Sequence, residues 1–206
     1  MSASSGTYPE TAGPDPVALT QQLVRFNITN PPGNETQCIQ HIKALLDSAG
    51  IQNQVLANSP SRPNLIARLP GNGSAAPLLL QGHVDVVLAD PAVWQQPPFS
   101  GNLVDGYIWG RGSLDMKGGI AMMVSAMLRA KSEGMTPTGD IVLALVSDEE
   151  SGGNQGARYL VEQHPEQFQG IKHAIGEFGG STQSWWPRNG CATSGLLFAG
   201  AVDMVR

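Results

Sequence analysis

The sequence predicts an α/β domain built on a largely parallel sheet. Two observations carry this prediction. Apolar segments with strand patterns alternate with amphipathic segments of helical period, and acidic or histidine side chains directly follow three of the predicted strands. The 206 residues are enough for one domain with a sizeable core. We therefore expect one sheet covered by helices, with the reactive groups at the carboxyl ends of its strands.

Helices are predicted where apolar residues recur at three-to-four spacing. Pro16 stands in the first turn of the first such segment, where the missing N–H of proline is tolerated, and Gly50 ends the second. An Asn-Pro-Pro-Gly run at 30–33 marks the turn between them. The predicted helices cover residues 17–26, 35–49, 118–133 and 155–163.

Strands are predicted where the period changes to two or where a short apolar run stands between turn signals. The run at 78–80 continues into Gln81-Gly82-His83, and the run at 141–146 is continuously apolar, as in a strand buried on both faces. Between these two runs, residues 91–101 form a predicted proline-rich loop. The predicted strands cover residues 55–57, 64–69, 78–80, 141–146 and 173–175.

Composition excludes several classes of function. The net charge of −5 and the lack of any Lys/Arg cluster argue against a nucleic-acid partner. Cys38 and Cys191 are too few for a disulfide framework. No apolar run is long enough to span a bilayer, and the N-terminus lacks the pattern of a secretion signal. We therefore expect a cytoplasmic protein without a membrane partner.

A histidine and two aspartates are the first candidate site residues. If the strand continues through His83-Val84-Asp85, the two side chains face the same side and can serve one site, although such a pair alone is more often an ordinary polar strand end. Asp115 lies in a glycine-rich loop at 110–119 just before the 118–133 helix. The loop lacks the spacing of nucleotide-binding loops, so a phosphate cradle is disfavoured, whereas a helix cap stays open.

Three adjacent carboxylates, Asp148, Glu149 and Glu150, follow the 141–146 strand. Like charges this close repel one another unless cations or protons neutralise them, and a solvated acidic loop is the alternative. Glu177 follows the 173–175 strand in the same way. One histidine with several isolated carboxylates is the mixed nitrogen and oxygen set that suits zinc or a similar divalent ion. The other histidines, His41, His164 and His173, fit structural roles better.

Taken together, these motifs resemble the M20 family of metallopeptidases, which includes aminoacylases, acetylornithine deacetylases, succinyl-diaminopimelate desuccinylases and carboxypeptidases. The resemblance rests on G-H-x-D at 82–85, G-R-G-S-x-D-M-K-G-G at 110–119, D-E-E-x-G-G at 148–153 and the glutamate after the next strand. It covers residues 17–180. It implies a three-layer αβα fold with a mostly parallel sheet, the N-terminal part of a zinc-peptidase-like catalytic domain.

The resemblance assigns metal ligands to this sequence. It implies that His83 and Glu177 bind one metal ion, that Glu150 binds the other, and that Asp115 bridges both. Two cations held together by a bridging carboxylate can polarise a carbonyl and activate a water. The expected cofactors are two divalent ions, zinc first, with cobalt or manganese also acceptable to these ligands.

The same resemblance implies the reaction and the residues that perform it. The expected activity is hydrolysis of amide bonds in N-acyl amino acids or small peptides by a metal-activated water. Glu149 would be the general base that takes the proton of this water and passes it to the leaving amine. Asp85 would orient His83, and Asp148 would support the site without binding metal.

The last part of the sequence departs from the family pattern. The lid or dimerisation domain of the family and its C-terminal histidine ligand have no counterpart, so we expect a truncated chain with an incomplete second metal site and no family-type homodimer. A frameshift after residue 180 would explain the atypical end. The predicted organisation is a disordered tail at 1–14, a partial metallohydrolase domain at 15–180 and an atypical tail at 181–206.

Two alternatives to a metal-dependent hydrolase remain at this point. One is a catalytically inactive remnant that keeps one metal site. The other is a nucleotide-binding α/β domain, which the missing phosphate loop disfavours.

Overall fold

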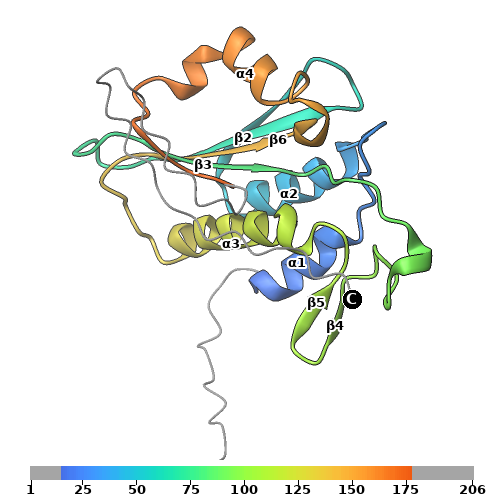
Figure 1. The fold of residues 1–206 in the computed structure, drawn as a ribbon. Coiled ribbons are helices and arrows are strands. Elements are labelled where there is room, and N and C mark those ends of the chain that lie inside the picture. The colour runs from blue at the N-terminus through green and yellow to red at the C-terminus, as the bar shows by residue number, and fades with distance from the viewer. Residues whose placement is uncertain (1–14, 178–206) are drawn as a thin grey trace, which may run out of the picture.

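The computed structural model describes residues 15–177, which form a five-stranded sheet with helices on both faces (Figure 1). The predicted tails at 1–14 and 181–206 lie outside the described residues. The strand order is β1-β2-β6-β3-β7, and a separate two-stranded hairpin is formed by β4 and β5. The strands of the large sheet are β1 (Gln52–Ala57), β2 (Pro63–Leu69), β3 (Leu78–His83), β6 (Ile141–Val146) and β7 (His173–Ile175).

Four of these five strands run in the same direction. β3 pairs parallel with β6 and β7, whereas β2 pairs antiparallel with β1 and β6. β1 and β2 follow one another across a short turn, and a connection of that length permits only antiparallel pairing. The predicted α/β class and mostly parallel sheet are confirmed, with β2 as the reversed strand.

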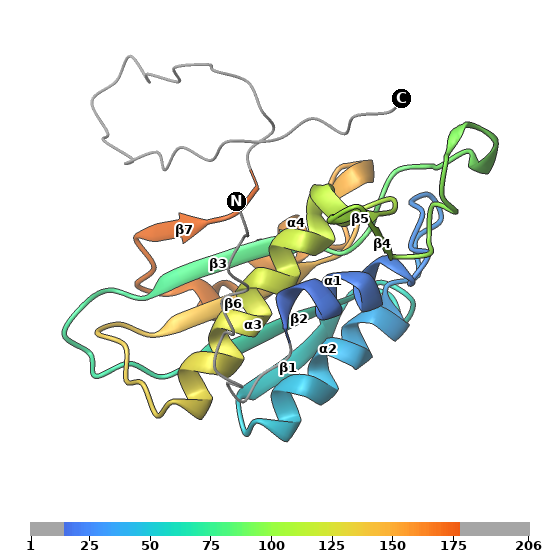
Figure 2. The same ribbon diagram turned by 90° about the horizontal axis from the view of Figure 1, so that it is seen from below.

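Helices cover the sheet in two layers, so the predicted αβα arrangement is confirmed. Figure 2 shows three helices laid across one face, and α4 lies over the other face. The alternation of side chains along β6 explains this. Leu143 and Leu145 pack with the three helices, whereas Val142 and Val146 pack with Leu160 of α4. The helices are α1 (Pro16–Val24), α2 (Thr36–Ser48), α3 (Gly118–Ser132) and α4 (Ala157–Gln163).

The two central strands determine where functional groups can meet. β3 and β6 are parallel neighbours, and His83 at the end of β3 is in register with Val146 at the end of β6. The Val84 N–H still donates to the Val146 oxygen at 3.0 Å, which keeps the two chains together just beyond the strands. The segments that leave these strands therefore start side by side at one edge of the sheet.

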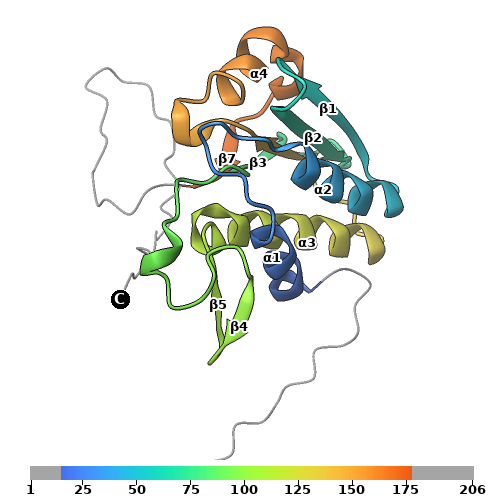
Figure 3. The ribbon, with the colours of Figure 1, turned by 90° about the vertical axis from the view of Figure 1, so that its right-hand side faces the viewer.

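The sequence patterns did not predict the β-hairpin at residues 102–109. β4 (Asn102–Val104) and β5 (Tyr107–Trp109) are joined by Asp105-Gly106, both with positive φ, 53° and 83°. An Asp-Gly pair is a strong signal for this turn, but strands of three residues carry too little alternation to be recognised. The hairpin extends beside α1, away from the sheet (Figure 3). The preceding 91–101 loop contains one helical turn, Pro91–Val93.

No helix among the described residues is both long and apolar enough to cross a membrane.

Gly156 is buried where α4 begins, and a side chain there would meet the backbone of Ser147. We expect Gly156→Ala to lower the free energy of unfolding by about 1–3 kcal/mol, because the backbone must move to admit the methyl group. Urea denaturation measures this. Gly119→Ala is the matched control, since its methyl group would meet only the mobile end of Met116 and should change stability by no more than about 1 kcal/mol. Equal effects in the two variants would refute the close approach.

Candidate metal centre

His83 lies at the centre of the site and is 1% exposed. Its Nδ1 lies 3.0 Å from the backbone oxygen of Asp85, which can only accept a hydrogen bond, so Nδ1 carries a proton. The other ring nitrogen, Nε2, lies 2.9 Å from both the Asp115 Oδ1 and the Glu177 Oε2 atoms. The backbone therefore fixes the ring so that Nε2 faces two carboxylates.

The surroundings of His83 attract positive charge. Burial disfavours the charged ring, but hydrogen bonds with the neighbouring carboxylates, Asp115 first, outweigh it and raise the pKa of His83 to about 12. In this arrangement a proton on Nε2 occupies the position that a metal ion would take between the nitrogen and the carboxylate oxygens. The centre therefore suits a cation.

Asp115 comes from the turn before α3 and is not a helix cap. Its φ of −114° and ψ of 97° are not helical, and α3 begins at Gly118 without a side-chain cap. The Asp115 carboxylate bonds His83 and is 46% exposed. The helix-cap alternative is therefore excluded, and the carboxylate is accessible from solvent.

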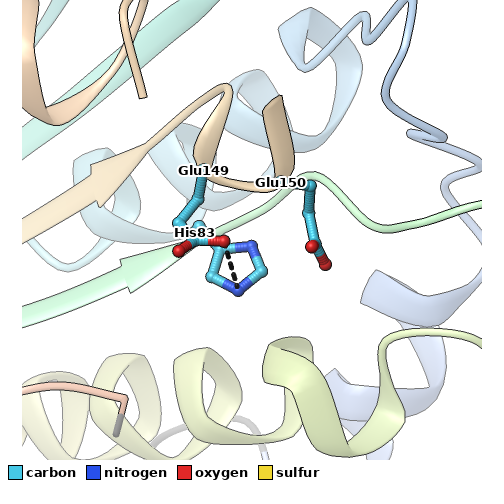
Figure 4. A group of neighbouring side chains, drawn as sticks. All are labelled: His83, Glu149 and Glu150. Atoms are coloured by element: carbon cyan, nitrogen blue, oxygen red, sulfur yellow. Dashed lines mark ion pairs between the residues drawn. The ribbon is translucent and has the colours of Figure 1, made fainter. Parts of the chain in front are cut away.

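Glu149 and Glu150 come from a turn that follows β6, Glu149–Ser151, and their side chains flank His83 (Figure 4). The backbone N–H groups of Glu149 and Glu150 donate to Oδ1 and Oδ2 of Asp85, both at 3.1 Å. The Glu149 Oε2 atom lies 3.9 Å from His83 Nε2. The Asp85 carboxylate thus holds the turn that carries the two glutamates.

Asp85 contacts the His83 ring from beyond the end of the strand. β3 ends at His83 and does not continue through Asp85. The Asp85 carboxylate is 3.5 Å from His83 Nδ1, whereas its backbone oxygen is 3.0 Å away. Asp85 therefore contacts the imidazole with its backbone oxygen and, at longer distance, with its carboxylate, which also accepts the N–H groups of Glu149 and Glu150.

Two groups of side chains within the described residues could hold a metal ion. The first is His83, Asp115 and Glu177, and the second is His83, Glu149 and Glu150. In each group one ligand atom per residue lies within 4.8 Å of the others. Every residue predicted as a ligand belongs to one of these groups, and His83 belongs to both. An imidazole nitrogen with carboxylate oxygens fits zinc and similar divalent ions.

The carboxylates of the second group are electrostatically frustrated. Burial is the main cause that raises the pKa of Glu149, and the charges of Glu177, Asp85 and Asp115 add to it. Burial, with the charges of Asp115 and Glu149, raises the pKa of Glu150 to about 7. A nearby cation would remove this repulsion, so the charge distribution also fits a metal ion.

The third carboxylate of the acidic run, Asp148, belongs to neither group. Its Oδ1 accepts from Arg62 Nη2 at 3.0 Å and from Asn30 Nδ2 at 3.2 Å, and its Oδ2 accepts from the Gln155 N–H at 3.1 Å. These donors occupy the carboxylate, which leaves it a supporting role. Arg62 and Asn30 were missed in the sequence, because no local pattern links them to residues about 90–120 positions away.

The remaining described histidines lie apart from both groups. His41 Nε2 is 3.1 Å from Gln22 Oε1 on the neighbouring helix α1, and His164 Nε2 is 3.0 Å from the Tyr159 hydroxyl. His173 begins β7 and is exposed. Their structural interpretation agrees with these contacts.

Comparisons with known proteins identify the family. The model of peptidase family M20/M25/M40 matches residues 79–188, more than half of the chain. A succinyl-diaminopimelate desuccinylase from Paracoccus denitrificans is 37% identical over 150 residues, which are 72% of this chain and 38% of that protein. A second desuccinylase, from Rhodospirillum centenum, is 32% identical over 154 residues. The chain thus spans less than two fifths of the length of these relatives.

Solved structures with the same fold are similar at lower sequence identity. An M20 family metallo-carboxypeptidase from Sulfolobus solfataricus superposes with a TM-score of 0.70 at 19% identity, covering 81% of this chain and 38% of that one. Human carnosine dipeptidase 1 superposes with a TM-score of 0.65 at 18% identity, covering 78% and 37%. The predicted resemblance is confirmed by the family model and by the fold. The chain therefore belongs to the peptidase family M20/M25/M40, a family of metallohydrolases.

Proposed function

We propose that this chain catalyses the metal-dependent hydrolysis of amide bonds in N-acyl amino acids or small peptides. The observation that carries the proposal is the position of His83, a buried histidine at the end of β3 whose Nε2 lies 2.9 Å from two carboxylates. Buried imidazole with converging carboxylates is the ligand type that zinc hydrolases use. The desuccinylase relatives suggest N-succinyl amino acids as the first substrates to test.

The proposed ligands are distributed over two positions. His83, Asp115 and Glu177 would hold the first ion, and Glu150 and Asp115 would supply ligands to the second. Ions bound there would polarise the scissile carbonyl and lower the pKa of a water. The first position has a complete set of three ligands within residues 15–177, whereas Glu150 and Asp115 give the second only carboxylate ligands there.

Glu149 is the proposed general base. Its side chain is 52% exposed, and no group among the described residues donates a hydrogen bond to it. Burial and the neighbouring negative charges raise its pKa, and a carboxylate with a raised pKa takes up a proton more readily near neutral pH. Glu149 can therefore accept the proton of the attacking water and deliver it to the leaving amine.

Metal content and amide hydrolysis, measured together on the 206-residue chain, test this function. We expect zinc to co-purify or rebind, and we expect amine release from N-succinyl or N-acetyl amino acids that a chelator stops and zinc restores. Chelator-insensitive hydrolysis or a chain without zinc would contradict the proposal.

A chain that binds zinc without hydrolysing these substrates is the second candidate function. The sharing of His83 between the two ligand groups favours it, because one imidazole nitrogen serves one ion at full strength. The same measurements separate the two candidates, since this one keeps the zinc and loses the amine release.

A further inference from the structure

We propose that Arg62 is a positioning residue that sets the orientation of the acidic turn and thereby the metal position formed with Glu150. The acidic turn is defined here as residues 148–150. This inference rests on the proposed function. Arg62 makes none of the contacts expected of a ligand, and it acts only through the residues that it holds.

Arg62 joins three parts of the chain through its guanidinium group. Nε donates to Glu35 Oε2 at 2.8 Å, Nη1 donates to the Pro32 oxygen at 3.0 Å, and Nη2 donates to Asp148 Oδ1 at 3.0 Å. The side chains of Arg62, Glu35 and Asp148 are 13%, 0% and 8% exposed. Charged groups buried this deeply are costly unless paired, so the arrangement is maintained by mutual compensation.

Asp148 transmits this arrangement to the acidic turn. Its φ of 67° lies in the left-handed region, which non-glycine residues seldom adopt, and its side chain is fixed by Arg62 and Asn30. The next two residues are Glu149 and Glu150. The direction in which their side chains leave the backbone therefore depends on how firmly the Asp148 carboxylate is held.

Asn30 forms a second path from this network to the same turn. Its Nδ2 group donates to Asp85 Oδ2 at 2.7 Å as well as to Asp148 Oδ1 at 3.2 Å. The Asp85 carboxylate then accepts the N–H groups of Glu149 and Glu150. Both ends of the acidic turn are thus attached to one buried network that contains Arg62.

The network reaches Glu149 and Glu150 through Asp148 and Asp85, but it reaches the group of Asp115 and Glu177 only through the contact of Asp85 with His83. Asp115 lies in the turn before α3 and Glu177 follows β7, and within residues 15–177 no hydrogen bond or ion pair joins either of them to Arg62, Glu35 or Asn30. Loosening Arg62 should therefore disturb the position with Glu150 and leave the position of Asp115 and Glu177 with much smaller changes. Partners that orient metal ligands typically change metal affinity about 10–100-fold when they are replaced.

The Arg62→Lys variant tests whether the geometry of the guanidinium matters beyond its positive charge. It keeps the positive charge that compensates Glu35 and Asp148, but a single ammonium cannot reach three acceptors in the fixed directions of a guanidinium. Arg68→Lys is the matched control, because Arg68 also bonds a carboxylate, Asp140 at 2.8 Å, and a backbone oxygen at 3.1 Å away from the site.

Cobalt titrations of the 206-residue chain, followed by the visible spectrum that reports ligand geometry, provide the metal readout. We expect Arg62→Lys to weaken one cobalt equivalent about 10–100-fold and to change its spectrum, while the other equivalent is unchanged. Glu35→Gln, a milder change in the same network, should act in the same direction and serves if the lysine variant does not fold. Arg68→Lys should bind cobalt as the unmodified chain does.

Hydrogen exchange of the Glu149 and Glu150 amides gives a readout that needs no metal. Both amides should exchange faster in Arg62→Lys than in the Arg68→Lys control. If the unmodified chain binds cobalt and the two variants behave alike, this inference is wrong and the proposed function stands. If the unmodified chain binds no cobalt, the proposed function fails, and equal exchange rates in the two variants would then overturn the positioning role as well.

Discussion

Glu149→Gln is expected to lower kcat for amide hydrolysis by about 10²–10⁴-fold, the usual contribution of a positioned general base. The amide has nearly the shape of the carboxylate but cannot take a proton from water. Because Glu149 is proposed as a base and not as a ligand, the zinc content should stay the same. Steady-state rates with N-succinyl and N-acetyl amino acids, together with metal analysis of the same preparations, measure both quantities.

Glu162→Gln provides the comparison for this variant. Glu162 is exposed on α4, where it pairs with Arg158 at 2.8 Å, outside both ligand groups. Its replacement should leave kcat and zinc content unchanged. Activity of Glu149→Gln equal to that of Glu162→Gln would remove the proposed role of Glu149, and a parallel loss of zinc would make Glu149 a ligand instead.

His83→Ala should weaken zinc binding by more than about 100-fold, since the loss of an outer partner alone costs about 10–100-fold. His83 is the residue that both ligand groups have in common, so this one substitution removes the nitrogen donor from each. Competition with a coloured zinc chelator measures the affinity of every position in one titration.

The control for His83→Ala is His164→Ala, which removes an imidazole bonded to Tyr159 outside both ligand groups. It should bind zinc as the unmodified chain does, even if its melting temperature falls. Retention of the full zinc stoichiometry by His83→Ala would rule out the proposed position formed by His83, Asp115 and Glu177.

The bounds of β6, which is buried along most of its length, are as predicted, because a continuous apolar run between polar residues leaves little freedom. The bounds of the exposed edge strand β7 are also as predicted. β1 was predicted to start at residue 55 but starts at Gln52, since this edge strand carries polar side chains that give no apolar signal. Apolar runs therefore located the strands of the sheet, whereas the polar first half of β1 was missed.

The candidate ligands were predictable because they follow strands whose ends must meet. His83 ends β3 and Glu150 follows β6, and parallel pairing of those strands brings them together. The buried network of Arg62, Asn30 and Asp148 was not predictable. Hydrogen bonds between side chains of separate loops leave no period in the sequence, and only the folded chain brings such loops into contact.

His83 belongs to both ligand groups, and this limits how strongly a second ion can bind. Nδ1 is committed to the Asp85 carbonyl, so Nε2 is the one lone pair that this imidazole can offer. An ion held there by His83, Asp115 and Glu177 would leave the proposed position at Glu150 with carboxylate ligands alone, so a second ion would bind more weakly. Occupancy would then follow the supply of metal in two separate stages, each with its own coordination number, so that the ambient ion concentration decides which form of the centre prevails.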